Sequence, residues 1–388
     1  MPRYRRSAVR GVEMLWQVAI RTLLADRGKL LAGLLGVAFS VLLVNLQGGL
    51  FLGLIGKASL LVHQGNADIW VGHREMHNVD FPHDIPRRWL PRIRAAQGVL
   101  AAEPITIGFS EIALPTGGFE GVTVFGVEPH SEIAPPWEII EGHADALDHP
   151  HAVVVDQYDQ EKLIHPAIGE LREIGGVRAR IMGKTRGMHG FLVTPYVFTT
   201  TDRAAQYTGK PSAHCSYFLV RVAPGADVEE TCAAIRQRLP EAEVMPSEEY
   251  ASVSINYWMT RTGLGISFGA AALLGLLVGL VMVGQTLYAM VLDRLTEFAT
   301  LKAIGATERE ILIVLLGQAA GIASIGIAVG LTAVMLLIAF YDSPQAPLEI
   351  PLSMMVVSSS GIFLMCTFAS MLPYMRVRRV DAHSVLQS

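Results

Sequence analysis

Long apolar stretches without charged side chains dominate the pattern of this chain. Crossing about 30 Å of hydrocarbon takes about 20 helical residues, because no water is available there to satisfy an open backbone. Four stretches meet this length and contain no Asp, Glu, Lys or Arg. We therefore predict four membrane-spanning helices, at residues 30–56, 262–292, 311–341 and 350–375.

Positively charged residues lie unevenly beside these spans, which predicts their orientation. Seven Arg and Lys residues precede the first span, and Arg376, Arg378 and Arg379 follow the last one. The connection at 342–349 has two acids and no base. We expect both termini and residues 293–310 to be cytoplasmic, and residues 57–261 and 342–349 to lie outside.

The two cytoplasmic ends differ in character. Within residues 1–29, apolar positions recur at helical spacing from Val12 to Leu24 and polar ones interrupt them, so we predict an amphipathic helix along the inner membrane surface, with Trp16 as an interfacial anchor. Residues 376–388 form a short, basic tail.

Residues 57–261 have the composition of a globular domain, and about 200 residues can bury a core. Short β-type runs are separated by Pro and Gly. The predicted fold class is a membrane α-helical protein with four transmembrane helices and a mixed α/β extracytoplasmic domain inserted between helices 1 and 2. The runs are 67–71, 121–127, 152–156, 177–182, 191–199 and 216–222.

The clearest unit of this domain is strand, helix, strand, at residues 216–222, 228–239 and 242–245. Apolar residues of its middle segment share one helical face. We interpret the unit as half of a ferredoxin-type motif that packs a helix on a small sheet.

Composition excludes several functions. The chain is 51% apolar, with a formal charge of -4 and no long run of Lys and Arg, so a nucleic-acid binder is not expected. Three cysteines are too few for a disulfide framework or a Cys-rich zinc site. Cys215 and Cys232 either pair in an oxidising compartment or are two buried thiols, and Cys366 packs in an apolar run.

Two short segments resemble catalytic or binding motifs, but each lacks a required residue. Residues 182–185, Met-Gly-Lys-Thr, resemble the end of a phosphate-binding loop, but Arg178 stands where its first glycine belongs, and we expect a β-turn with a solvated lysine. His73 and His77 are one helical turn apart, but Arg74 replaces the glutamate of a zincin motif. We expect a polar surface loop there, and no metal, cofactor or catalysis in this chain.

Polar side chains and small residues inside the spans are the remaining exceptions. They hydrogen-bond between helices or line a substrate path, and packing is the favoured interpretation. A Gly-x-x-x-Gly spacing in the first span further suggests a homodimer. The residues concerned are Asn45, Gln47, Gly49, Gly53, Gln285 and Gln318.

The segment 293–310 carries the most specific pattern. Leu295, Phe298, Leu301 and Ile304 form an apolar stripe beside charged residues, and Gly305 ends the helix. Thr307 with Glu310 three residues later is a capping box that opens the next helix. The pattern predicts a short amphipathic helix at the inner membrane face.

This segment resembles the Glu-Ile-Gly-x-Leu-Lys-Ala-Leu-Gly-Ala stretch of FtsX/MacB-type ABC transporter permeases, with Phe298 and Ala299 in place of Ile-Gly. Residues 66–71, Asn-Ala-Asp-Ile-Trp-Val, resemble the entry into the outer domain of that family, and residues 378–386 resemble its tail. The N-terminal helix and the unsplit four-span plan are most similar to the DevC-like branch. The matching positions are Glu297, Leu301, Lys302, Ala303, Gly305 and Ala306.

The resemblance implies that segment 293–310 is a coupling helix that docks on a separate ATP-binding subunit. That subunit would bind ATP and Mg, and this chain would hold no cofactor. It further implies a permease homodimer in a bacterial inner membrane, in some members with a periplasmic adaptor and an outer-membrane duct. The expected coupling residues are Arg294, Glu297, Phe298, Leu301, Lys302, Gly305, Ala306, Thr307 and Glu310.

Three functions remain open on sequence. The first is export of a lipid-like or peptide-like substrate, driven by ATP hydrolysis in the partner. The second is FtsX-like signalling to periplasmic hydrolases, without transport. The third, a membrane-anchored metallohydrolase, depends on His73 and His77 alone.

Overall fold

The computed structural model describes residues 23, 26–134, 138–142, 145–187, 192, 194–303, 306–340 and 348–378. The chain divides into two compact units. One, called the membrane unit here, takes in the described residues up to Leu52 and those from Gly265 onward. The other, called the inserted domain, is Gly53–Leu264.

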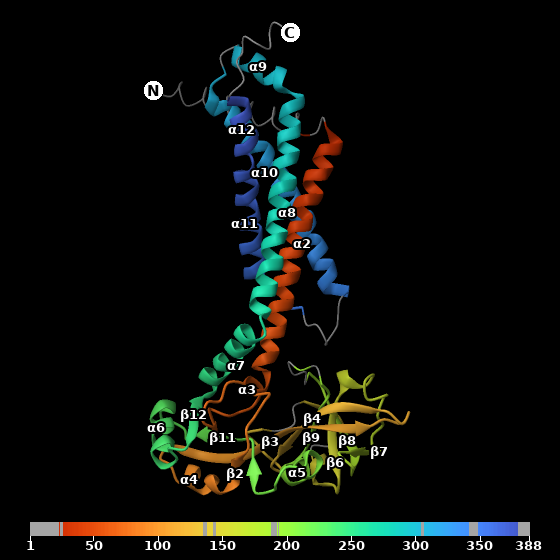
Figure 1. Cartoon of the computed structure of the whole chain (residues 1–388), viewed down its shortest axis with the longest axis vertical. Coiled ribbons are helices and arrows are strands. Elements are labelled where there is room, and N and C mark those ends of the chain that lie inside the picture. Colours follow the sequence, from red (N-terminus) through yellow and green to blue (C-terminus); the bar gives the residue numbers. More distant parts are fainter. Residues whose placement is uncertain are drawn as a thin grey trace. The chain divides into compact units, whose positions relative to one another are not determined.

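Four helices in the described part of the chain are long and apolar enough to cross a membrane. They are α2 (Arg27–Ala58), α8 (Leu264–Asp293), α10 (Glu308–Phe340) and α11 (Leu352–Ala369), the last continued by α12 (Met371–Arg378). Within the membrane unit they run side by side (Figure 1). The predicted class, four spans with a domain between the first two, is confirmed.

Glycines allow these helices to approach closely. A Cβ atom added at Gly36 of α2 would lie 2.7 Å from the Cβ of Met282 in α8, and one at Gly330 of α10 would lie 2.7 Å from the Cβ of Val41 in α2. Close approach through small residues is how membrane helices gain dispersion contacts without a hydrophobic driving force. Larger residues here would push the helices of the unit apart.

The helix bounds shift the predicted spans slightly. The second span begins at Leu264 rather than 262, because Gly263 takes a left-handed conformation (φ 68°) that separates α8 from the preceding helix. The third begins at Glu308 rather than 311. Of the predicted N-terminal amphipathic helix only Leu23 is among the described residues, and most of the predicted tail lies outside them.

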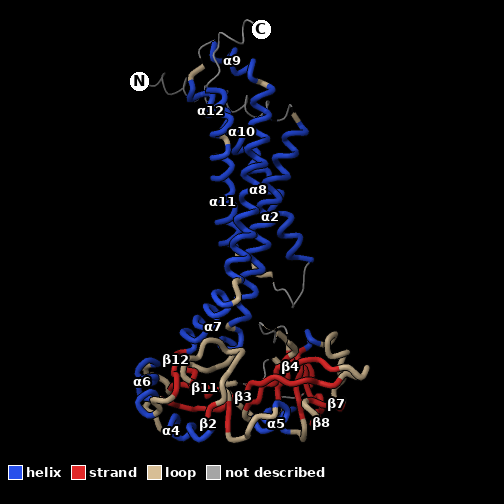
Figure 2. The backbone as a smooth tube through the Cα atoms, viewed as in Figure 1, coloured by secondary structure: helices blue, strands red, loops and turns tan. Residues whose placement is uncertain are grey.

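The inserted domain contains one large sheet with helices on it (Figure 2). Its described strands are β1 (Ile69–His73), β2 (Ile85–Pro86), β3 (Val99–Ala113), β4 (Phe119–Val127), β5 (Ile139–Gly142), β6 (Ala152–Asp156), β7 (Leu171–Ile174), β8 (Val177–Thr185), β9 (Tyr196–Thr200), β10 (His214–Cys215), β11 (Tyr217–Val222) and β12 (Ala242–Pro246). Its described α-helices are α3 (Leu60–Gln64), α4 (Leu90–Arg94), α5 (Thr201–Thr208), α6 (Val228–Arg238) and α7 (Ser247–Arg261).

The first half of the sheet is ferredoxin-like. Its strands lie in the order β12-β1-β11-β3 and all neighbours are antiparallel. Helix α4 falls between β1 and β3 in the chain, and α6 connects β11 to β12, so two β-α-β units interlock. The predicted strand-helix-strand unit is the second of these, and Asp227 caps its helix by accepting from the Glu230 N–H (3.0 Å).

Side chains of this half alternate between two cores, as strand geometry requires. Ile69 and Val71 of β1 pack with Ile235 of α6 in one cluster. Trp70, between them, packs with Tyr250 of α7 in a second cluster on the other face. The helices α6 and α7 therefore cover opposite faces of the same strands.

Strand β3 joins the two halves of the sheet. Its first part pairs with β11 and its second part with β4. Beyond β4 the order continues β9-β6-β8, and β7 links β8 back to β3 at Ile112 and Ile174, so six strands close a ring. Its interior is a separate apolar cluster that includes Val124, Val155 and Val197.

Candidate functional site

The segment between the second and third spans folds as predicted into a short helix, α9 (Leu295–Ala303). Phe298 on its inner face is 5% exposed and packs in a cluster with Val291 of α8, Leu315 of α10 and Val377 of α12. Leu301 packs against the same cluster. The predicted apolar stripe thus attaches α9 to the ends of three other helices, and Ile304 of that stripe lies outside the described residues.

Lys302, one turn after Phe298, also attaches α9 to α12. Its Nζ donates to the main-chain oxygens of Val377 (2.9 Å) and Arg378 (3.2 Å). These carbonyls end α12, where an ammonium group satisfies acceptors that the helix leaves unpaired. Arg378 in turn lies 3.6 Å from Glu308 at the start of α10. The last described turn of α12 is therefore held by charged groups from α9 and α10.

The junction between α9 and α10 contains the predicted capping box. The Thr307 N–H donates to Glu310 Oε2 (2.8 Å), and the Glu310 N–H lies 3.4 Å from Thr307 Oγ1. The Ala306 N–H donates to the Leu301 carbonyl oxygen (2.9 Å), the bond that closes a helix past a C′ residue. Gly305, the predicted end of the helix, lies outside the described residues.

Glu297 is the predicted coupling residue that faces outward. Its side chain is 65% exposed, and its one ion pair among the described residues is a 3.6 Å contact with Arg294 one turn earlier. Thr296 and Thr300 beside it are also exposed. The structure thus separates the predicted coupling residues: Phe298, Leu301, Lys302, Thr307 and Glu310 make contacts within the chain, and the Glu297 side chain is largely exposed.

The polar residues of the spans serve mainly intrachain packing. Asn45 is buried in α2 and exchanges hydrogen bonds with Ser358 of α11 (3.0 and 3.2 Å). Gly49 accepts a hydrogen bond from the Glu349 N–H (3.1 Å), and a Cβ there would lie 2.4 Å from Ile350 Cγ1. The glycine spacing, which suggested a homodimer, is therefore already used inside one chain at Gly49.

The other polar and small positions of the spans differ in exposure. Gly53 and Gln318 are buried, and Gln47 is half-buried. Gln285 is exposed on α8 and lines an apolar cavity of about 410 Å³ with Tyr288 and Leu372. None of these positions is shown to line a path through the unit.

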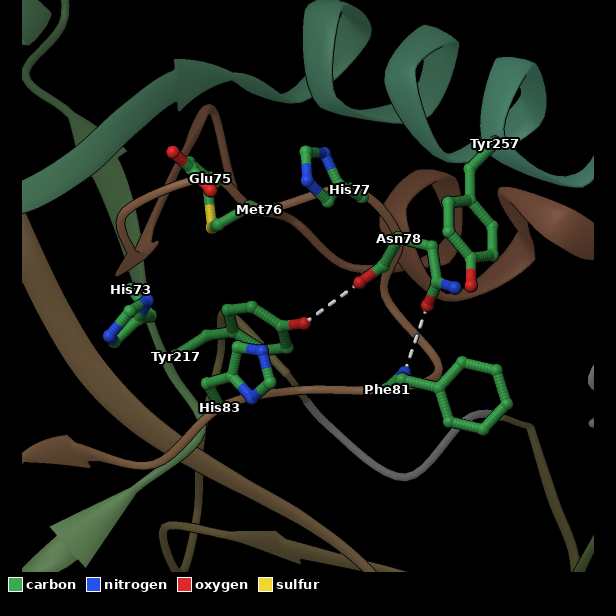
Figure 3. A pocket seen from close by; sticks show the side chains of 9 residues that line it. All are labelled: His73, Glu75, Met76, His77, Asn78, Phe81, His83, Tyr217 and Tyr257. Carbon is green, nitrogen blue, oxygen red and sulfur yellow. Dashed lines mark hydrogen bonds between the residues drawn. The ribbon is translucent and has the colours of Figure 1, made fainter. Parts of the chain in front are cut away.

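The inserted domain has its own hollow, of about 220 Å³, where the loop after β1 passes under α7 (Figure 3). His73 Nδ1 lies 2.7 Å from the Arg74 carbonyl oxygen, and the His73 and His83 rings are 5.3 Å apart, edge to face. In the described part of the chain no three His, Cys, Asp or Glu side chains are placed to hold a metal ion. The hollow is lined by His73, Glu75, Met76, His77, Asn78, Phe81, His83, Tyr217 and Tyr257.

Buried hydrogen bonds shape the loop that forms this hollow. The Tyr217 hydroxyl donates to the Asn78 carbonyl oxygen (3.1 Å), and Asn78 Oδ1 accepts from the Phe81 N–H (2.9 Å) (Figure 3). The Tyr250 hydroxyl donates to the same carbonyl oxygen (2.9 Å). The Trp258 Nε1–H donates to Asp80 (3.0 Å). Burial raises the pKa of the Asp80 carboxyl to about 6, and the bond from Trp258 opposes the shift. The predicted polar surface loop is present, since His73, His77 and His83 are exposed, but Asn78 and Asp80 between them are buried.

The Met-Gly-Lys-Thr sequence does not form the β-turn that we expected. It lies inside strand β8, where Lys184 pairs along the ladder with β6 and is 8% exposed. Its Nζ forms an ion pair with Glu141 (2.9 Å). A phosphate-binding loop needs free backbone amides at a helix start, and these amides belong to a sheet.

The cysteines are buried thiols. Cys215 and Cys232 lie in the apolar cluster that contains Ile235 of α6, and they form no disulfide. Burial raises the pKa of the Cys215 thiol to about 12 and that of the Cys232 thiol to about 11. Cys366 is buried in the membrane unit. The packing interpretation holds for all three.

The arrangement defines a class of protein: a multi-pass membrane protein with an α/β domain between its first two spans and a short amphipathic helix between its second and third. The sequence profile of the MacB-like periplasmic core domain matches residues 30–238, and that of the FtsX-like permease C-terminal region matches residues 269–382. The first match covers more than half of the chain. The chain belongs to the MacB/FtsX-type family of ABC transporter permeases.

Two mycobacterial relatives agree with this assignment. An uncharacterized ABC transporter permease of Mycobacterium bovis is 26% identical over 331 residues, 84% of this chain and 83% of the relative. Another, from Mycobacterium tuberculosis, is 24% identical over 330 residues with the same coverage.

Two solved domains are also similar to part of the chain. The periplasmic region of MacB from Actinobacillus actinomycetemcomitans is 8% identical, with a TM-score of 0.39, and the match covers 48% of this chain and 92% of that one. The extracellular domain of the ABC-type transporter YknZ from Gram-positive bacteria is 11% identical, with a TM-score of 0.36, covering 46% and 98%.

Proposed function

We propose that this chain is the non-catalytic permease subunit that couples ATP hydrolysis in a separate ATP-binding subunit to movement of the inserted domain, and thereby to export of a lipid-like or peptide-like substrate. The observation that carries the proposal is α9, a helix packed inward through Phe298 and Lys302 that presents Glu297 outward. A segment held this firmly can transmit a push.

The direction of transmission follows from the contacts of α9. Displacement of Phe298 would move Val291 at the end of α8 and Leu315 in α10, because these side chains share one apolar cluster. Helix α8 follows directly from the inserted domain in the chain. Motion applied at α9 would in this way reach the other end of the second span.

The rest of the assembly follows from the family. The partner subunit would bind ATP and Mg, and this chain would be one of two copies in a bacterial inner membrane, with both termini and α9 cytoplasmic and the inserted domain outside. A periplasmic adaptor and an outer-membrane duct would complete an export path, as in the DevC-like arrangement. The alternative is FtsX-like signalling to periplasmic hydrolases, and the test must distinguish it from export.

The test is purification of the detergent-solubilised chain from its native host, with co-purifying proteins identified by mass spectrometry. We expect a small ATP-binding subunit, and an adaptor in addition if the system exports. Recovery of a peptidoglycan hydrolase instead would favour signalling. Recovery of the chain alone, with the ATP-binding subunit present in the lysate, would contradict the proposal.

A charge reversal locates the docking site. Glu297→Arg should abolish recovery of the ATP-binding subunit, because a positive guanidinium would replace the exposed negative carboxylate that faces the partner. Glu229→Arg, on an exposed position of α6, is the matched control and should leave recovery unchanged. Equal recovery with both variants would place the docking surface elsewhere.

A further inference from the structure

A second, more polar hollow of about 250 Å³ lies on one face of α7 in the inserted domain. Its lining positions on α7 follow helical spacing, so they share a single stripe along the last two turns. His77 of the loop after β1 completes the lining. The α7 residues are Val253, Asn256, Tyr257, Thr260 and Arg261.

This hollow is suited to an anion. Its lining contains a guanidinium, an imidazole, an amide and two hydroxyls, and no carboxylate. Within the described part of the chain, Arg261 and His77 have neither a hydrogen bond nor an ion pair to another side chain, and both are exposed. Arginine stays charged at any physiological pH and offers paired N–H donors, which match two oxygens of a phosphate.

The neighbouring hollow of Figure 3 adds an apolar compartment. The two hollows share His77 and Tyr257. Beyond these, the first hollow offers mainly apolar surface from Met76, Phe81 and Tyr217, and its one carboxylate, Glu75, lies on the side away from Tyr257 (Figure 3). Together the hollows offer donors at one end and aromatic surface at the other, which fits an amphiphile.

Chain connectivity limits how far this stripe can lie from the start of the second span. Arg261 precedes Leu264, the first residue of α8, by three positions. Three residues span at most about 10 Å, so the guanidinium is tethered near the point where the second span enters the bilayer. Lipid phosphates are concentrated in the polar zone just outside the hydrocarbon core.

We propose that the two hollows bind a phosphate-bearing group, with Arg261 and His77 on the phosphate oxygens and the aromatic hollow against the apolar part of the same molecule. The chemistry selects a phosphate mono- or diester, and the position of the site favours a lipid headgroup as its source. The proposal goes beyond coupling to an ATP-binding subunit and does not depend on it, because the site lies within this chain.

The experiment is isothermal titration of the full-length permease in dodecyl maltoside micelles. The probes are dihexanoyl phosphatidylglycerol and, separately, inorganic phosphate. We expect saturable binding of the lipid, weakened about tenfold or more by Arg261→Gln, since a hydrogen-bonded charge is lost. Arg88→Gln, an exposed arginine of the same domain outside both hollows, is the matched control and should bind like the unchanged chain.

Further variants separate the sources and guard against misfolding. Arg261→Lys keeps the charge and should recover part of the affinity. If Tyr257→Ala weakens binding of the lipid but not of phosphate, or if phosphate alone does not bind, the site takes a lipid headgroup. If phosphate binds with the same dependence on Arg261, a free anion suffices. Absence of saturable binding by both probes, or equal binding by Arg261→Gln and Arg88→Gln, overturns the proposal.

Discussion

The two helices that flank α8 in the chain are built differently. Helix α7, before it, has one buried face on which Tyr250, Ser254 and Trp258 all make hydrogen bonds inside the inserted domain. Helix α9, after it, buries one aromatic residue, Phe298, and leaves the Glu297 carboxylate largely in solvent.

The difference predicts which substitutions affect stability and which affect assembly. Buried hydrogen bonds fix geometry, because breaking one leaves an unpaired group in a dry environment. Exposed charges contribute little to folding and are free to select a partner. Substitutions on the buried face of α7 should therefore affect stability, and substitutions on the outer face of α9 should affect assembly.

The largest effect is expected from Trp258→Ala in α7. It removes a large buried side chain and leaves the Asp80 carboxyl without its donor, so we expect a loss of about 3–5 kcal/mol of unfolding free energy. Trp258→Phe, which keeps most of the volume, should lose less. Thermal unfolding of the full chain in micelles checks this, and equal melting temperatures for Trp258→Ala and the unchanged chain would contradict it.

Asp80→Asn should change how stability depends on pH. Burial raises the pKa of Asp80 from 3.8 to about 6, so the folded state binds the proton more tightly than the unfolded state. The unchanged chain therefore loses stability as pH rises from about 4 to about 6, by up to about 3 kcal/mol from this group. The variant cannot ionise and should lack this loss.

Melting curves at pH 4.5 and pH 7.5 measure the effect. The asparagine oxygen can still accept a hydrogen bond from Trp258. The stability of the variant relative to the unchanged chain should therefore be higher at pH 7.5 than at pH 4.5. Asp159, whose pKa burial also raises to about 6, adds the same trend to both proteins and cancels in the difference. A difference between the two proteins that does not vary with pH would show that Asp80 is not held in its neutral form.

Lys302→Met tests the attachment of α9. The charged donor to the Val377 and Arg378 carbonyls is lost while the apolar stem is kept, and we expect about 1–2 kcal/mol less protection at the α9–α12 contact. Hydrogen exchange followed by mass spectrometry measures this locally. Unchanged exchange in residues 371–378 would mean that the apolar cluster alone holds α9.

Glu297→Gln should have the smallest effect on folding, below about 0.5 kcal/mol, because the carboxylate is exposed and its contact with Arg294 is a surface pair. The same change should weaken association with the ATP-binding subunit. Melting temperature and co-purification, measured on one preparation, separate the two. A large fall in melting temperature would show that Glu297 has a structural role.

The sequence predicts the features that are local. The spans follow from uninterrupted apolar runs, and the capping box of Thr307 and Glu310 follows from spacing alone. The strand-helix-strand unit near α6 was predictable because its periodicity changes within 30 residues. These features need no knowledge of distant segments.

Features that depend on distant segments were missed. The longest strand, β3, contains Pro104 and Gly108 and lacks clear alternation, because its two parts face different partners. Lys184 has the sequence context of a turn, and only pairing with β6 and Glu141 makes it a strand residue. At the candidate site, the sequence did not reveal that Lys302 binds α12, since no local pattern encodes that contact.

Cross-linking at α9 tests the central claim most directly. A photoreactive amino acid is placed at position 297 in the complex with its ATP-binding subunit, and at position 229 of α6 as the control. We expect a covalent product with the ATP-binding subunit from position 297 and none from position 229. Cross-linking from position 229, or none from position 297 in an intact complex, would contradict the assignment of α9 as the coupling helix.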